Sequence, residues 1–147
     1  MMIEILKKTS FVKGDVNLVV TEDEINDYLL KVKDAIKKDK YKLERNRNRN
    51  RVDNNNLFID YVIDETKVKN ILLKLTAKDF SEILQNEHKG YEHELLYVFG
   101  KDVELLERLG GSSRLVSLYI KFNKLDSCYV IVISFHEQKY PMKYYFK

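Results

Sequence analysis

The sequence is poor in the residues that would indicate a disulfide framework or a membrane span. It has one cysteine, one proline, five glycines and no tryptophan in 147 residues. Cys128 cannot form an internal disulfide, so we expect it to be a small core residue beside a strand. No stretch approaches ~18 continuous apolar residues, and the first residues lack the apolar core of a signal peptide. We therefore expect a soluble, cytoplasmic protein.

Several motifs of enzyme chemistry are also missing. The sequence has no P-loop, no Gly-x-Gly-x-x-Gly run, no Ser-x-Gly elbow and no Cys-x-x-Cys pair, so nucleotide-driven and thiol-redox mechanisms have no support. His88 and His93 lie among glutamates, but their spacing matches no strong zinc pattern. We favour a solvated charged turn there and expect no metal or other cofactor. A metal-dependent enzyme built on this pair is the least favoured hypothesis.

Composition predicts one folded domain over residues 1–147. The hydrophobic fraction is 44%, with ten tyrosines and seven phenylalanines, which suits a single core. A weak hairpin over residues 1–20 precedes this core, and the aromatic, basic tail 138–147 is expected to be an edge strand or a packed arm because of Pro141. The net charge of +3 is only mildly basic, so affinity for polyanions depends on where the charges gather.

Capping boxes and helical spacing predict the helices. Thr21 with Glu24 predicts a helix that ends near Lys38, and the apolar residues of 57–61 and 68–75 predict two short helices. A short strand is expected between these segments, at residues 41–44.

A second capping box predicts a further helix. Thr76 with Asp79 opens it and Glu87 ends it, and residues 92–109 predict another helix that is kinked near Gly100.

Two apolar runs, 114–123 and 129–136, predict an antiparallel pair of strands. A four-residue turn at 124–127 would place Asn123 opposite Cys128. The apolar residues of the two strands would then face each other: Val116, Leu118, Ile120 and Phe122 opposite Phe135, Ile133, Ile131 and Tyr129. Because helices come first and strands late, we expect an α+β fold in which N-terminal helices pack on a C-terminal antiparallel sheet.

The other face of this strand pair is the best candidate site. It carries Ser117, Tyr119, Lys121, Val132, Ser134 and His136. A histidine on a rigid strand, with an ordinary pKa of ~6.5, suits proton transfer; a half-buried histidine bonded to a backbone carbonyl is the alternative. In the predicted register His136 faces Leu115, ~13 Å along the strand from Tyr119. We therefore expect the two rings not to touch.

Basic residues gather in one segment. Residues 37–51 hold eight basic and two acidic side chains and end in the run Arg45-Asn-Arg-Asn-Arg-Asn-Arg51. In an extended chain Arg45, Arg47, Arg49 and Arg51 would lie on one face, ~6.6 Å apart, close to the phosphate spacing of an extended single strand. A solvated loop is the alternative. Arg114, opposite Glu137 in the predicted register, could bind a phosphate or form a salt bridge.

The order of these motifs resembles the MqsR-type toxins of bacterial toxin–antitoxin pairs. The resemblance runs from about Thr21 through Leu75-Thr-x-x-Asp-Phe80 to Leu118-Tyr-Ile-Lys121 and Val132-Ile-Ser-Phe-His-Glu137. That family is grouped with the RelE-like endonucleases, which cut messenger RNA free or on the ribosome. The resemblance implies a RelE-like fold, metal-independent cleavage of single-stranded RNA, no cofactor and a cognate antitoxin as partner.

The resemblance also implies roles for particular residues. Tyr119 and Lys121 match the functional tyrosine and lysine of the family's Tyr-x-Lys, and His136 stands where MqsR-type proteins have a catalytic lysine. Other RelE-like toxins use a histidine near the C-terminus. The chain departs from the pattern at Glu82, which with Ser81 replaces an expected lysine, and at Tyr97, which replaces a glutamine.

We interpret His136 as base or acid, Arg114 and Lys121 as cations for the phosphorane, and Tyr119 as a stacking or hydrogen-bonding group. Lys143 of the basic tail joins Arg45, Arg47, Arg49 and Arg51 as a candidate RNA-binding residue. The main rival is a binding module that holds RNA or a protein without cutting it.

The arginine run generates the first prediction. Replacing Arg45, Arg47, Arg49 and Arg51 with glutamine should weaken binding to single-stranded RNA and flatten its dependence on salt, because each phosphate contact adds to the counterion-release slope. Binding constants measured over a range of salt concentrations test this. An unchanged slope would identify the segment as a solvated loop.

Overall fold

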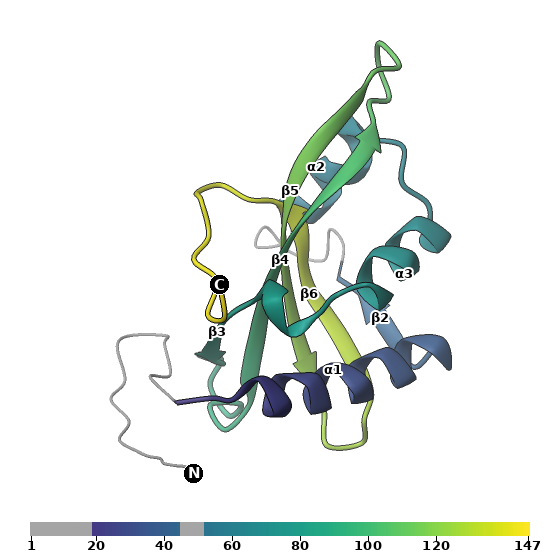
Figure 1. The fold of residues 1–147 in the computed structure, drawn as a ribbon. Coiled ribbons are helices and arrows are strands. Elements are labelled where there is room, and N and C mark those ends of the chain that lie inside the picture. The colour runs from purple at the N-terminus through teal and green to yellow at the C-terminus, as the bar shows by residue number, and fades with distance from the viewer. Residues whose placement is uncertain (1–18, 45–51) are drawn as a thin grey trace.

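A computed structural model describes residues 19–44 and 52–147, which form three α-helices packed on one mixed, mostly antiparallel sheet (Figure 1). The helices are α1 (Glu22–Lys37), α2 (Val52–Asp60) and α3 (Glu65–Leu73). The strands are β2 (Tyr41–Leu43), β3 (Phe80–Gln85), β4 (Leu95–Leu106), β5 (Ser113–Lys124) and β6 (Val130–Glu137). They are ordered β2-β6-β5-β4-β3, with β2 parallel to β6 and the other pairs antiparallel.

The predicted α+β class is confirmed, and so are the first three helices and the short strand. Two predictions lie outside the described residues: the N-terminal hairpin, apart from its last two residues, and the run Arg45, Arg47, Arg49 and Arg51. Within the described ranges, no helix is long and apolar enough to cross a membrane.

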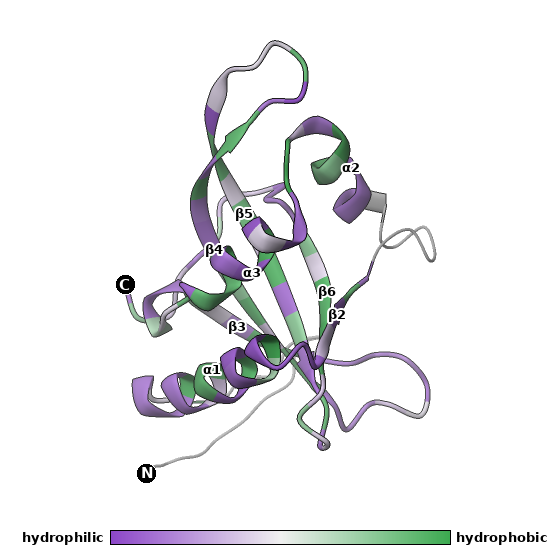
Figure 2. Cartoon of the chain, turned by 90° about the vertical axis from the view of Figure 1, so that its right-hand side faces the viewer, coloured by the Kyte–Doolittle hydropathy of each residue, from purple (hydrophilic) through white to green (hydrophobic). Residues whose placement is uncertain are grey.

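Helix α1 begins at the predicted capping box. The Thr21 hydroxyl accepts from the Glu24 N–H at 3.1 Å, and the Glu24 carboxylate accepts from the Thr21 N–H at 2.8 Å. These bonds satisfy two of the donors that a helix start leaves unpaired. Figure 2 shows hydrophobic residues along α1. Those buried in the core include Ile25, Val32 and Ile36, so α1 is held by an apolar stripe that covers the sheet.

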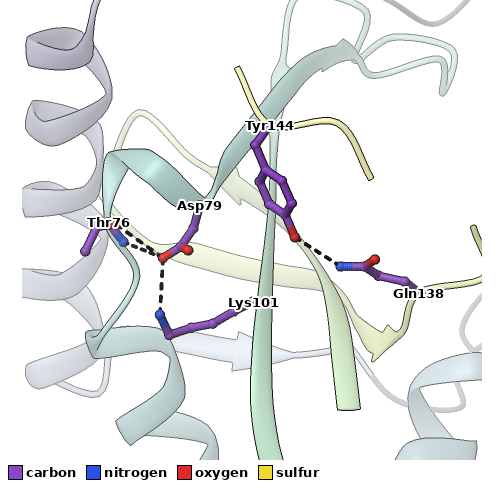
Figure 3. A network of polar contacts seen from close by, with 5 residues as sticks. All are labelled: Thr76, Asp79, Lys101, Gln138 and Tyr144. Atoms are coloured by element: carbon purple, nitrogen blue, oxygen red, sulfur yellow. Dashed lines mark hydrogen bonds and ion pairs between the residues drawn. The ribbon is translucent and has the colours of Figure 1, made fainter. Parts of the chain in front are cut away.

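The helix predicted after Thr76 is wrong. Its capping box exists, since the Asp79 carboxylate accepts from the Thr76 N–H at 2.8 Å. The same carboxylate also accepts from Lys101 Nζ at 3.3 Å (Figure 3). The box closes a single 3-10 turn, Ala77–Asp79, after which the chain extends as β3. The spacing of Phe80 and Ile83 suits a helix as well as a strand, and pairing with β4 decides between them.

The helix predicted over residues 92–109 is also wrong, because that segment contains β4. Val98 and Phe99 are adjacent and both fully buried, since β4 lies between β5 and β3 and both of its faces are covered at this point. Burial on both faces removes the alternation that would have indicated a strand. Gly110 and Gly111, at φ of 89° and 68°, turn the chain into β5 instead of ending a helix.

The predicted pairing of β5 with β6 is wrong by four residues at the histidine. The turn is tighter than expected: the Leu125 N–H donates to the Tyr129 carbonyl and the Cys128 N–H donates to the Leu125 carbonyl, both at 2.8 Å, with Cys128 at φ 69°. Cys128 is therefore exposed in a three-residue turn and is not a core residue. This turn accounts for three residues of the difference.

A β-bulge accounts for the fourth residue. Phe122 pairs with Val132 and Lys121 pairs with Ser134, so Ile133 is the extra residue of β6. The odd shift at the turn puts Val130 and Val132 in the core, in place of the predicted Tyr129 and Ile131, so Val132 does not belong to the polar face. The bulge restores the predicted faces beyond it, with Phe135 in the core. Beyond it, Tyr119 lies opposite His136.

The outer edge of β6 is completed by a side chain. Within residues 41–44, the described stretch at this edge, strand β2 pairs with β6 over Val130–Val132. Farther along, the Asn54 amide of α2 donates to the Ile133 carbonyl at 2.9 Å and accepts from the Phe135 N–H at 2.8 Å. It also donates to the Glu44 carbonyl at 2.7 Å. Asn54 thus replaces a neighbouring strand and satisfies buried backbone groups beside His136.

This contact generates the second prediction. Asn54→Ala should lower the free energy of unfolding by about 2–4 kcal/mol, because it leaves the Phe135 N–H and the Ile133 carbonyl without their partner. Urea unfolding measures the loss. Asn56→Ala, at an exposed position of the same helix, is the matched control for helix propensity and should be near neutral. Equal stability of the two variants would contradict the role given to Asn54.

Candidate functional site

Strand pairing places the candidate site residues in two rows that run across the strands on one face of the sheet. Glu82, Val98, Lys121 and Ser134 form one row, and Gly100, Tyr119 and His136 form the next. Residues of the same strands at the alternate positions, such as Leu118 and Ile120, are fully buried in the core. The rows therefore lie on the face opposite that core, as expected for period-two alternation.

Tyr119 and His136 are stacked. Their ring centroids are 5.1 Å apart and their planes differ by 10°, which corrects the predicted separation of ~13 Å. His136 Nδ1 lies 2.9 Å from the Glu137 carbonyl oxygen. Because a carbonyl oxygen can only accept, Nδ1 carries the proton of the neutral ring and Nε2 is left as the basic atom.

Burial lowers the pKa of His136 below its ordinary value of 6.5. The positive charges of Lys139 and Lys121 act in the same direction, while the bond to the Glu137 carbonyl and the charge of Asp53 oppose them. Desolvation is the largest of these effects. It lowers the pKa because it penalises the charged imidazolium. At pH 7 the ring is therefore mainly neutral, which is the form that a general base requires.

The stacked pair lines an open cavity of about 1070 Å³. Other residues that line it include Glu82 and Gln85 of β3, Lys121 of β5, Ser134 of β6, the carboxylates of Asp53 and Glu87, and Lys139, Tyr140 and Lys143. A cavity of this size can take a nucleotide or a short strand. We call it the sheet groove.

The C-terminal segment 138–147, which we call the arm, forms one wall of the sheet groove. Figure 1 shows it on the side of the sheet away from α3. The Gln138 amide donates to the Leu118 carbonyl at 3.0 Å and to Tyr144 Oη at 3.3 Å (Figure 3). At the other end, the Tyr145 N–H donates to the Phe80 carbonyl at 2.9 Å. The arm thus spans the sheet from β5 to β3.

Of the other predicted site residues, some line the sheet groove and one does not. Lys121 and Lys143 line the groove, but Arg114 does not. Arg114 pairs with Leu105 in the sheet and lies 3.7 Å from Glu107 in a partly exposed salt bridge. Its predicted partner, Glu137, lies opposite Leu118 instead. Arg114 shares the parity of the buried core residues of β5, so it faces away from Tyr119.

The two remaining histidines lie differently with respect to the sheet groove. His88 lines the sheet groove, whereas His93 does not. In the part of the chain that the structure describes, no group of three or more His, Cys, Asp or Glu side chains could hold a metal ion.

Sequence reasoning missed Gln85 and Tyr140 as lining residues. Gln85 fell in a segment predicted as a helix, and no pattern indicated which way the tail would fold. A scan against protein-family models, a search of curated proteins and a search of solved structures found no significant match. Inference about function therefore depends on the geometry of the groove and on the motifs that form it.

The third prediction concerns the protonation of His136. In an NMR titration of the imidazole nitrogens, its pKa should lie below 6.5, and Tyr119→Ala should raise it towards 6.5 by exposing the ring to water. Tyr129→Ala, at the far end of the β5–β6 hairpin, is the control and should leave it unchanged. The stacking account would be contradicted if Tyr119→Ala had no effect.

Proposed function

We propose that the protein is a cytoplasmic endoribonuclease toxin with a RelE-like fold that cuts single-stranded messenger RNA without a metal. The observation that carries this proposal is the stack of His136 on Tyr119, beside Lys121, at the floor of an open groove. A neutral imidazole with a free Nε2 is a base, and Lys121 supplies positive charge close enough to lower the histidine pKa.

These groups suit cleavage by the RNA's own 2′-hydroxyl. His136 Nε2 takes the 2′-hydroxyl proton, the 2′-oxygen bonds to phosphorus, and the bond from phosphorus to the 5′-oxygen breaks. Lys121 stabilises the added negative charge on the phosphorane. The leaving 5′-oxygen takes a proton from water in the open groove. The products are a 2′,3′-cyclic phosphate and a 5′-hydroxyl.

The resemblance to MqsR-type toxins supports the same assignment. Its two most specific motifs, Tyr119-x-Lys121 and Ser134-Phe-His136, lie on paired strands, with Tyr119 opposite His136 and Lys121 opposite Ser134. The residues that the resemblance groups by function are thus neighbours in space. Messenger RNA, free or on the ribosome, and a cognate antitoxin are the partners that this proposal implies.

A second candidate function is a non-catalytic module with a toxin-like fold that binds RNA or a protein. Glu82 favours it, because this carboxylate stands where the family has a lysine and it lines the sheet groove. A negative charge at this position opposes phosphate binding.

The fourth prediction separates the two candidates. His136→Ala should reduce RNA cleavage at least ~100-fold with the fold intact, because one general base is typically worth that much. Degradation of single-stranded RNA by purified protein, and RNA integrity after induction in a bacterium, measure the effect. His93→Ala, which removes a histidine outside the groove, is the matched control and should cleave like the wild type.

The same assay tests the chemistry. Cleavage should persist in EDTA, leave a 2′,3′-cyclic or 3′-phosphate, and stop at a 2′-O-methylated site, where binding should survive. Products with a 3′-hydroxyl, or loss of activity in EDTA, would overturn the mechanism in favour of a metal. RNA binding without any cleavage would favour the binding module.

A further inference from the structure

The arm is fixed at both ends and forms a wall of the sheet groove between them. At its start, the Gln138 N–H donates to the Ser117 carbonyl at 2.8 Å, and Lys139 pairs with Asp53 at 2.7 Å. At its end, the Ser81 hydroxyl donates to the Lys143 carbonyl at 2.6 Å, and Phe146 packs on Phe80. Residues 140–142 bridge these two anchors, and we call them the arch.

The side chains of Met142 and Tyr144 lie against β4 because Gly100 has no side chain. A Cβ atom at Gly100 would clash with Tyr144 Oη and Met142 Sδ, so glycine permits this approach. Pro141 fixes its own φ and restricts the backbone of Tyr140 before it. The arch is therefore a constrained wall of the site.

Tyr140 differs from the other aromatic residues of the arm. Tyr145 and Phe146 contact the ring of Phe80, and Tyr144 packs over Gly100. Tyr140 is 80% exposed, yet it lines the same groove as Tyr119 and His136. An exposed ring held on a constrained backbone offers a flat apolar surface at a low entropic cost.

Two lysines lie on either side of this ring along the chain. Lys139, which is paired with Asp53, and Lys143 flank the arch, and both line the groove together with the carboxylates of Asp53, Glu82 and Glu87. Proteins that bind single-stranded nucleic acid combine aromatic stacking faces with cations that follow the backbone. A base in a duplex has both faces covered by its neighbours, so only an unpaired nucleotide can use such a ring.

We propose that Tyr140 is a nucleobase-stacking residue that binds the base of an unpaired nucleotide close to the scissile phosphate. This inference rests on the proposed function and adds the source of its selectivity for single-stranded RNA. Tyr140 acts in binding and positioning, while His136 and Lys121 act on the reacting atoms.

The test measures affinity and turnover separately. Kd is measured for a 2′-O-methylated single-stranded oligonucleotide, which cannot be cleaved, and kcat and KM for its unmodified form. Tyr140→Ala should raise Kd and KM about 5- to 150-fold, the range for loss of one stacked base, with kcat within about threefold. Tyr140→Phe should behave like the wild type, because it retains the ring. Tyr91→Ala removes an exposed tyrosine outside the groove and should change nothing.

Abasic substitutions locate the partner base. In the wild type, removing one base near the cleavage site should raise Kd, and in Tyr140→Ala the same removal should have no further effect. An unchanged Kd in Tyr140→Ala, with cleavage intact in the wild type, would overturn this inference and leave the proposed function standing. Absence of RNA binding and cleavage by the wild type would overturn both.

Discussion

The register of β5 against β6 is the constraint on which the candidate site depends. A slip of one residue would move His136 to the core face, because side chains alternate across a strand. Three features hold the register: the three-residue turn with Cys128 at positive φ, the bulge at Ile133, and the Asn54 amide on the edge of β6. Each is local, and together they place His136 opposite Tyr119. The chemistry proposed for the groove thus follows from backbone hydrogen bonds more than from any contact between the catalytic side chains.

The packed core on the other face of these strands explains why the polar site lies on a rigid surface. The helix side of β4, β5 and β6 is filled by large apolar residues, including Phe99, Phe122 and Phe135, so the strands cannot adjust without disturbing the core. Tyr119 covers one face of the imidazole, and burial of the ring lowers its pKa and so favours the neutral form. The core thus fixes the position of the imidazole, and its burial sets the direction of its pKa shift.

Much of the fold could be predicted from the sequence where the signal was local. The Thr21–Glu24 box and its apolar stripe located α1, and the alternation in β5 identified one strand and the polar face that carries Tyr119 and Lys121. Pairing depends on features that composition does not reveal, such as a bulge at Ile133 and a non-glycine residue at positive φ in the turn. Strand β4 was missed because burial on both faces gives adjacent apolar residues such as Val98 and Phe99, a pattern shared with helices. Strand β3 was missed because the capping box before it and the spacing of Phe80 and Ile83 suit a helix as well, so the β3 wall of the groove could not be foreseen.

The arm bears on one of the two departures that weaken the resemblance to the toxin family. Glu82 removes a positive charge from β3, where the family pattern expects a lysine. The preceding residue, Ser81, donates to the carbonyl of Lys143 at 2.6 Å, so the arm sets a lysine at the same edge of the groove. Affinity for a phosphate backbone depends on the number and placement of cations and not on the strand that carries them. If the protein cleaves RNA as proposed, the arm restores on one side of the groove the charge that β3 lacks, and the acidic residue at position 82 is then compatible with an active nuclease.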